Sequence, residues 1–290
     1  MKKAIALLMT LLLIFACAGC KQTRQAVSIA DALTLADLEG IRIAAQEGTF
    51  HAEAATQISK AKVTTYATFD DLLKALKDGE VDGYVAEEPT AKTVCAKDDS
   101  LTYIPLINNT TGFTVAAEDV SACVALLPES PLRGQVNTVL ATITNVQKQT
   151  AMDEMVALAV GEKVKAPLTL TLDTSVEDDA PVLKVGMEGA YTPFNWSTSQ
   201  KDTFAQPITG GAKAGQYADG YDVQIAKYIA DMMGMKLEIH ALEWNALVPA
   251  LEEGTIDCIV GGMSPSDNKD ANMEYTVSYY ESNLVVVTKK

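Results

Sequence analysis

One short pattern occurs twice in this chain and suggests how the chain is organised. Residues 77–82 read Lys-Asp-Gly-Glu-Val-Asp, and residues 252–257 read Glu-Glu-Gly-Thr-Ile-Asp. Each time a helical stretch ends at an acidic residue and a glycine, and a β-branched residue and an aspartate then lead into an apolar strand. A repeat of this kind indicates two lobes of similar topology within one chain.

Strands and helices alternate around both copies of the pattern. In the first half we expect strands at 41–45, 63–66 and 81–86, and helices at 50–59 and 68–78. In the second half we expect strands at 183–186, 236–240 and 256–260, and helices at 222–233 and 244–252. Apolar positions at helical spacing predict two more helices between 131 and 159. This alternation predicts an open α/β layer in each half, and 290 residues suffice for two such cores.

The two halves are separated by residues 161–181, which show no helical period. This stretch contains two prolines, the β-prone run Leu-Thr-Leu-Thr-Leu and the acidic run Glu-Asp-Asp. We interpret it as a linker with one edge strand.

The start of the chain has the pattern of an export signal. A basic start is followed by an apolar run from Ala4 to Ala16, which is too short to span a bilayer and fits a signal peptide. It ends in Cys17-Ala18-Gly19-Cys20, which resembles the lipobox of bacterial lipoproteins, although Cys17 stands where that motif usually has Leu. This predicts a signal peptide at 1–19, a tether at 20–30, and lipidation of Cys20. The protein would then be anchored to the extracytoplasmic face of the cell membrane. An ordinary cleaved signal with a chance cysteine is the alternative.

Charge and composition exclude several classes of partner. The formal net charge of −15 makes nucleic acid and anionic lipid headgroups poor partners. Cys95, Cys123 and Cys258 lack metal-ligand spacing and are interpreted as structural thiols, and the chain has only two histidines. We therefore expect no metal and no cofactor.

Several strings, taken in order, resemble one protein family. In the second half they are KVGMEGAYTPFNW, DGYDVQIAKYIADMMGMKLEI, EWNALVPALEEGTIDCIVGGMSPS and YTVSYYESNLVVVTKK. In the first half they are LADLEGIRIAAQEGT, YATFDDLLKALKDGEVDGYVAEEP and TGFTVAAED. Together they resemble the amino-acid-binding family of extracytoplasmic solute receptors that serve ABC importers. The resemblance implies a two-lobed periplasmic-binding-protein-like (type II) fold. It also implies that the protein captures an amino acid and delivers it to a membrane permease.

The order of the halves is reversed relative to that family. Residues 182–290 resemble the family's first lobe, residues 31–118 its second lobe, and residues 119–160 its helical return segment. The simplest account is a circular permutation in which residues 161–181 join the old ends. About twenty extended residues span about 60–70 Å, enough to reach across a lobe. A fragment of a tandem protein is the alternative. On this comparison Lys290 ends where the family crosses its hinge, leaving only the crossing near 111–116 intact.

The resemblance also implies a set of ligand-binding residues. The ligand carboxylate needs backbone N–H donors and a cation, which Gly262, Ser264 and Lys269 would supply together with the N–H of Thr49. Lys269 stands where the family has an Arg, and Lys cannot make the two-pronged contact of that residue. A surface position within a charge cluster is the alternative for Lys269.

The remaining implied contacts concern the ligand's ammonium and side chain. Glu87 stands where the family usually has an Asp that binds the ammonium, and Tyr191 and Trp244 would form aromatic walls. Glu188 stands where the family often has an acid facing the ligand side chain, which favours a polar or cationic one. Plain core packing is the alternative for the two aromatic residues, and a solvated strand end is the alternative for Glu87.

Two other functions remain open from the sequence. An enzyme on the same fold, similar to cyclohexadienyl dehydratase, would need an acid–base pair, and we can assign no catalytic residue. A ligand-sensing module is the other alternative. The expected protein is therefore a receptor and not an enzyme.

Overall fold

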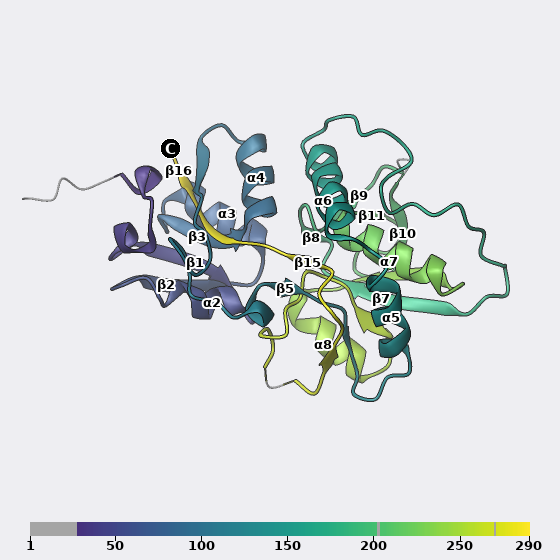
Figure 1. Ribbon diagram of the computed structural model, residues 1–290. Coiled ribbons are helices and arrows are strands. Elements are labelled where there is room, and N and C mark those ends of the chain that lie inside the picture. Colours follow the sequence, from purple (N-terminus) through teal and green to yellow (C-terminus); the bar gives the residue numbers. More distant parts are fainter. Residues whose placement is uncertain (1–27, 202–203, 270) are drawn as a thin grey trace, which may run out of the picture.

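The computed structural model describes residues 28–201, 204–269 and 271–290, which form two α/β lobes (Figure 1). The predicted signal peptide and the lipidation residue Cys20 lie outside the described residues, as does most of the predicted tether. Within the described part of the chain, no helix combines the length and apolar character needed to cross a bilayer.

Lobe A is built on a five-stranded sheet, in which four strands come from the first part of the chain and one from its end. Its strands follow the order β2-β1-β3-β16-β4, in which β1 pairs in parallel with β2 and β3, and β16 is antiparallel to both of its neighbours. Its elements are η2 Ile29–Asp31, η3 Leu35–Leu38, β1 Arg42–Gln46, α2 Phe50–Ala55, β2 Lys62–Tyr66, α3 Phe69–Asp78, β3 Gly83–Glu87, α4 Glu88–Lys97, β4 Leu101–Ile104, η4 Ala117–Asp119 and β16 Leu284–Lys289.

Lobe B follows the same plan in a larger sheet. Part of its nine-stranded order reads β12-β7-β13-β6-β14, in which β7 pairs in parallel with β12 and β13, and β6 is antiparallel to its neighbours. Its elements are β6 Ala125–Leu126, α5 Leu132–Leu140, α6 Asn145–Ala159, β7 Val182–Met187, β8 Ala190–Tyr191, β9 Asn195–Thr198, β10 Gln206–Gly211, β11 Tyr217–Asp219, α7 Tyr221–Met232, β12 Lys236–Ala241, α8 Trp244–Glu252, β13 Cys258–Ile259 and β14 Glu274–Tyr275.

In each lobe the antiparallel inner strand comes from a distant part of the chain. The C-terminal strand β16, yellow in Figure 1, lies in lobe A among strands from residues 42–104, and β6 enters lobe B after the chain has left lobe A. This exchange of strands between two similar sheets confirms the expected two-lobed, periplasmic-binding-protein-like (type II) fold.

The repeated sequence pattern has the same structural role in both lobes. Gly79 and Gly254 end α3 and α8 with left-handed backbone, at φ of +77° and +73°, which glycine adopts without strain. The aspartate that follows then clamps the first parallel strand of its sheet. The Asp82 carboxylate accepts the backbone N–H of Arg42 at 3.0 Å, and that of Asp257 accepts the N–H of Lys184 at 2.8 Å.

Two segments join the lobes, and they pair with each other. β5 (Ser121–Ala122) leads the chain from lobe A to lobe B, and β15 (Tyr280–Glu281) leads it back. The two are antiparallel, with Tyr280 opposite Ala122 and Glu281 opposite Ser121. The expectation of a single intact crossing near 111–116 is therefore wrong. Both crossings are continuous, because the chain passes the hinge at β15 and continues into β16 of lobe A.

Residues 161–181 connect α6 to β7 on lobe B without forming the expected edge strand. Leu168 and Leu170 are buried and pack into the core instead. The carboxylate of Glu154 on α6 accepts the N–H of Thr169 and its hydroxyl, the latter at 2.8 Å. Two buried leucines and the hydrogen bonds to Glu154 thus hold this segment against lobe B.

Candidate functional site

A small cavity lies between the two lobes beside the hinge. It occupies about 20 Å³, which is room for about one water molecule, so the lobes are closed upon each other. Lobe A supplies residues from β1, the start of α2, the start of α3 and the end of β3: Gln46, Thr49, Phe50, His51, Phe69 and Glu87. Lobe B supplies residues from β8, α8 and the loop after β13: Tyr191, Phe194, Trp244, Gly261, Gly262, Ser264 and Asp267. The hinge side is closed by Asp119, Val120, Ser121, Ala122, Tyr280 and Ser282.

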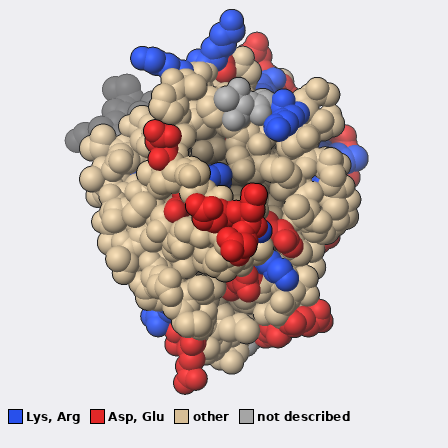
Figure 2. All heavy atoms as spheres, turned by 90° about the vertical axis from the view of Figure 1, so that its right-hand side faces the viewer, with Lys and Arg blue, Asp and Glu red and all other residues tan. Residues whose placement is uncertain are grey.

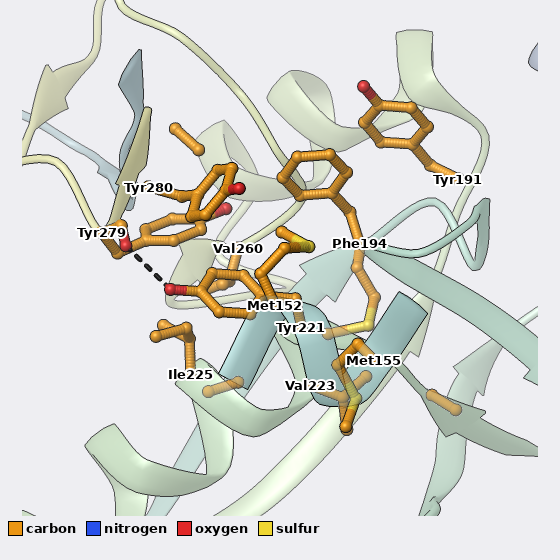
Figure 3. Close-up of a cluster of buried hydrophobic side chains, with 14 of the residues drawn as sticks. Met152, Met155, Tyr191, Phe194, Tyr221, Val223, Ile225, Val260, Tyr279 and Tyr280 are labelled. Atoms are coloured by element: carbon orange, nitrogen blue, oxygen red, sulfur yellow. Dashed lines mark hydrogen bonds between the residues drawn. The ribbon is translucent and has the colours of Figure 1, made fainter. Parts of the chain in front are cut away.

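Aromatic rings stack across the cleft. Phe69 of lobe A stacks on Tyr191 of lobe B with ring centroids 4.3 Å apart, and Tyr191 stacks on Phe194 at 4.8 Å. Figure 3 shows Tyr191 at the edge of this cluster, with Phe194 between it and the buried core of lobe B. The stack gives the cavity a flat apolar wall that continues into the core.

Glu87 and His51 form a buried pair on the lobe A side. Glu87 ends β3, its side chain is 16% exposed, and its Oε1 lies 3.0 Å from Nε2 of His51. Burial disfavours the charged imidazole, but the Glu87 carboxylate outweighs that effect and raises the pKa of His51. Glu87 therefore faces the cavity and is not a solvated strand end.

Glu188 lies beside the cavity, where it contacts the other lobe. Its side chain is buried, and Nε2 of Gln46 lies 3.4 Å from both of its carboxylate oxygens. Burial raises the pKa of Glu188 to about 7, against the opposing effects of Gln46 and of the Lys213 ammonium. This group changes its charge near neutral pH.

Asp267 occupies a position that sequence reasoning missed. Its carboxylate is buried and accepts two backbone N–H groups at 2.7 Å, from Phe50 of lobe A through Oδ1 and from Ser264 of lobe B through Oδ2. Burial raises its pKa to about 6, and the two N–H groups limit the rise. The pattern Ser264-x-x-Asp267, a capping-box spacing, is the sequence signal that could have identified this residue.

The prediction that Lys269 enters the site is wrong. Its ammonium lies on the rim, 2.7 Å from the carboxylate of Glu53, and the two side chains are 56% and 60% exposed. Its Nζ is 5.8 Å from the ring centroid of Phe50. The turn explains the placement, because Asn268 has left-handed backbone at φ +48° and separates an inward Asp267 from an outward Lys269.

The other predicted residues lie on the cavity or next to it. Tyr191, Trp244, Gly262, Ser264, Thr49 and Glu87 all line it, and Glu188 touches its edge through Gln46. Gly262 has φ +70°, and a Cβ there would lie 3.0 Å from the ring of Tyr191. Trp244 is 5% exposed and also packs in a core cluster. This residue therefore both lines the cavity and belongs to the hydrophobic core. The hydroxyl of Thr49 donates to the carbonyl of Gln46 at 2.9 Å.

Several buried polar atoms on the cavity wall have no hydrogen-bond partner among the described residues. They are Tyr191 Oη, Trp244 Nε1, Ser264 Oγ, His51 Nδ1 and Glu87 Oε2. A buried polar atom without a partner costs about 1–3 kcal/mol, so a set of five on one small cavity suits a polar solute. In the described part of the chain, no group of three or more His, Cys, Asp or Glu is arranged to hold a metal ion.

The sequence of the second half matches a family of receptors. Residues 183–290 match the model of the bacterial extracellular solute-binding proteins, family 3. The arginine-binding extracellular protein of Bacillus subtilis (strain 168) is 31% identical over 108 residues, which cover 37% of this chain and 36% of that protein. The L-arginine-binding protein of Pseudomonas aeruginosa is 30% identical over 112 residues, which cover 39% of this chain and 37% of that protein.

A match of lower sequence identity extends over more residues. The L-cystine-binding protein of Escherichia coli (strain K12) is 24% identical over 149 residues, which cover 51% of this chain and 50% of that protein. The matches thus span about a third to a half of these curated relatives. Residues 183–290 are similar to amino-acid-binding members of the bacterial extracellular solute-binding proteins, family 3.

Proposed function

We propose that this chain is an extracytoplasmic solute receptor that captures a small solute of the amino-acid class between its lobes. The observation that carries the proposal is the closed cavity, whose wall comes from both lobes and holds five partnerless polar atoms. Contacts to both lobes stabilise the closed form over the open one, and the paired strands β5 and β15 supply the hinge.

Each side of the cavity has a distinct role in this proposal. Glu87 binds the ligand's ammonium through Oε2, while its Oε1 stays with His51. The stacked rings of Phe69 and Tyr191 separate to admit the ligand's stem. Glu188 and Gln46 face the far end of the ligand and favour a polar or cationic side chain.

Delivery to an ABC-type importer and attachment to the membrane are parts of the same proposal. Support comes from the names of similar proteins, among them a probable amino-acid ABC transporter-binding protein of Haemophilus influenzae that is 29% identical over 107 residues. Attachment rests on the sequence Cys17-Ala18-Gly19-Cys20. Substitution Cys20→Ala should move the protein from the membrane fraction to the soluble extracytoplasmic fraction, and unchanged fractionation would contradict the lipid anchor.

A ligand screen tests the receptor function. The mature protein is heated with each of the standard amino acids, their amides and the amines derived from them, and each hit is measured by calorimetry. We expect a higher Tm with at least one compound and a Kd in the micromolar range or below. Steady-state conversion of prephenate, or a Tm that no compound changes, would contradict the proposal.

We also propose that the chain carries the family's lobes in circularly permuted order. The turn η2 packs beside β16 in lobe A, and residues 161–181 run along lobe B between α6 and β7. A chain that joins Lys290 to Ser28 and opens at Asp178 should therefore keep the fold. Because both hinge crossings are already continuous, its affinity should equal that of the parent. A folded product that binds nothing while the parent binds would favour a piece of a tandem protein.

A further inference from the structure

The cavity's own carboxylate uses two backbone donors that could otherwise bind a ligand carboxylate. The N–H groups of Phe50 and Ser264 point into the cleft from opposite lobes, and both donate to Asp267 at 2.7 Å. A backbone N–H makes one strong hydrogen bond, so neither group is free while Asp267 holds both. Asp267 is 5% exposed, which makes this a built contact inside the protein and not a surface accident.

Among the described residues, no cation on the cavity wall is left for a second carboxylate. Lys269, in the same loop, points to the rim and pairs with Glu53. Among the described residues that line the cavity, the basic side chain is His51, which lies against Glu87. A ligand carboxylate would have to leave water without gaining either a charge partner or the two N–H donors, which is strongly unfavourable.

The charges around the cavity favour a cation. Glu87 and Asp267 are carboxylates on its wall, Asp119 lines the hinge side, and Glu188 adjoins Gln46. The carboxylate of a ligand would add like-charge repulsion to this set at low dielectric. A cationic ligand has the opposite effect, because on the described cavity wall the carboxylates outnumber the basic side chain of His51.

Partnerless atoms indicate where such a ligand sits. Glu87 Oε2 is an acceptor suited to an ammonium, and Tyr191 Oη and Ser264 Oγ can accept or donate. Tyr191 and Ser264 are each 5% exposed, so their hydroxyl groups are shielded from solvent. The set includes no free cation.

We propose that the receptor's ligand is an organic cation of the amino-acid class whose α-carboxylate is absent or masked, a primary amine or an amide, with Asp267 in the place that a ligand carboxylate would take. This inference rests on the proposed receptor function and narrows it. Asp267 excludes zwitterions by charge, and the aromatic stack accommodates the stem of the amine.

Matched ligand pairs test the inference in the wild-type protein. Calorimetry compares arginine with agmatine and argininamide, lysine with cadaverine, ornithine with putrescine, and histidine with histamine. In at least one pair the compound without a free carboxylate should bind at least about tenfold more tightly than its amino acid. If every amino acid that binds does so as tightly as its partner or more tightly, the inference is overturned and the receptor function stands. If none of these compounds binds, and none of the compounds in the wider screen binds, the inference and the proposed receptor function are both contradicted.

Variants of Asp267 test whether this residue causes the preference for ligands without a free carboxylate. Asp267→Ala frees both N–H donors, so the amino acid of the discriminating pair should gain at least about tenfold in affinity while its amine changes less. Asp267→Asn keeps the shape and removes the charge, and should shift the preference in the same direction if the alanine variant does not fold. Glu53→Gln is the matched control, because it breaks another contact of this loop with lobe A, on the rim, and should leave the preference unchanged. An unchanged preference in the folded Asp267 variants would overturn the inference.

Discussion

Two of the contacts that the loop from Gly261 to Lys269 makes with lobe A have opposite surroundings. Inside the cleft the Asp267 carboxylate is buried and accepts two N–H groups, whereas on the rim Lys269 and Glu53 form an ion pair open to water. Charge-assisted bonds in a dry site are strong, but an exposed ion pair contributes about 0–1 kcal/mol. The comparison teaches that depth in the cleft, and not the presence of charge in the loop, decides which residue can face a ligand under the proposed function.

The largest loss of ligand affinity should follow from removing the charge of Glu87, the buried carboxylate that lobe A places on the cavity. Glu87→Gln leaves a ligand's ammonium, and His51, without a counter-ion in a buried site, which costs about 3–5 kcal/mol. Calorimetry should then show an affinity loss of at least about 100-fold. Glu88→Gln is the matched control, because Glu88 pairs with Lys92 at 2.9 Å outside the cavity and should change the affinity by less than about twofold. Similar affinities for the two variants would contradict the interior assignment of Glu87.

A smaller effect is expected at the aromatic wall. Trp244→Phe keeps a ring in the core but removes the Nε1 donor, which has no partner among the described residues. Loss of one hydrogen bond to the ligand costs about 1 kcal/mol, so affinity should fall roughly fivefold. Trp196→Phe in β9 removes the other tryptophan of the chain, away from the cavity, and should leave affinity unchanged. Equal affinity of both variants would indicate that Trp244 serves the core alone.

The buried carboxyls should also invert the usual dependence of stability on pH. The pKa of Glu188 is raised to about 7 by burial, and the pKa values of Asp222 and Asp267 are raised to about 6 for the same reason. Between each ordinary pKa and its raised value, the folded state binds more protons than the unfolded state. The stability these groups contribute is therefore fully present below about pH 4 and is lost as pH rises through 6 and 7. His51, whose pKa is also raised, acts in the same direction.

The Tm should accordingly fall by roughly a few °C as the pH is raised from 5 to 8. Glu188→Gln should flatten the part of the curve between pH 6 and pH 8 and leave the part below pH 6 in place. A Tm that rises over the whole range in the parent protein would contradict the burial of these groups in solution.

The smallest effect should come from the rim. Lys269→Arg keeps the positive charge and the contact with Glu53, and both side chains are exposed. Ligand affinity should change by less than about twofold, and the unfolding free energy by less than about 0.5 kcal/mol. A tenfold gain in affinity for a plain amino acid would show that residue 269 reaches the cleft, and would break the distinction between rim and interior.

Much of the fold could be predicted from the sequence because its signals are local. The cap at Thr68, whose hydroxyl accepts the N–H of Asp71 at 3.2 Å, and the glycine at position 79 define α3 without tertiary information. The lobe in which β16 lies could not be predicted, because a run of valines reads the same in either sheet. Local patterns do not specify which distant strand is the neighbour.

The site was predictable to the extent that each residue follows the direction of its own strand or helix. Glu87 at the end of β3 and Trp244 at the start of α8 face the cleft for that reason. Asp267 and Lys269 lie instead in an irregular turn, where one left-handed residue at Asn268 sends their side chains in opposite directions. His51 was missed although it is one of two histidines in the chain, because no local signal indicates that its ring contacts Glu87.

The position of β16 in the middle of lobe A has a consequence for biosynthesis. A chain made from its N-terminus produces β1 to β4 about 180 residues before β16, the strand that lies between β3 and β4. Until β16 is made, β3 and β4 lack the strand that pairs with both of them, and the five-stranded sheet stays incomplete. Lobe A thus completes its sheet only when nearly all of the chain has been made.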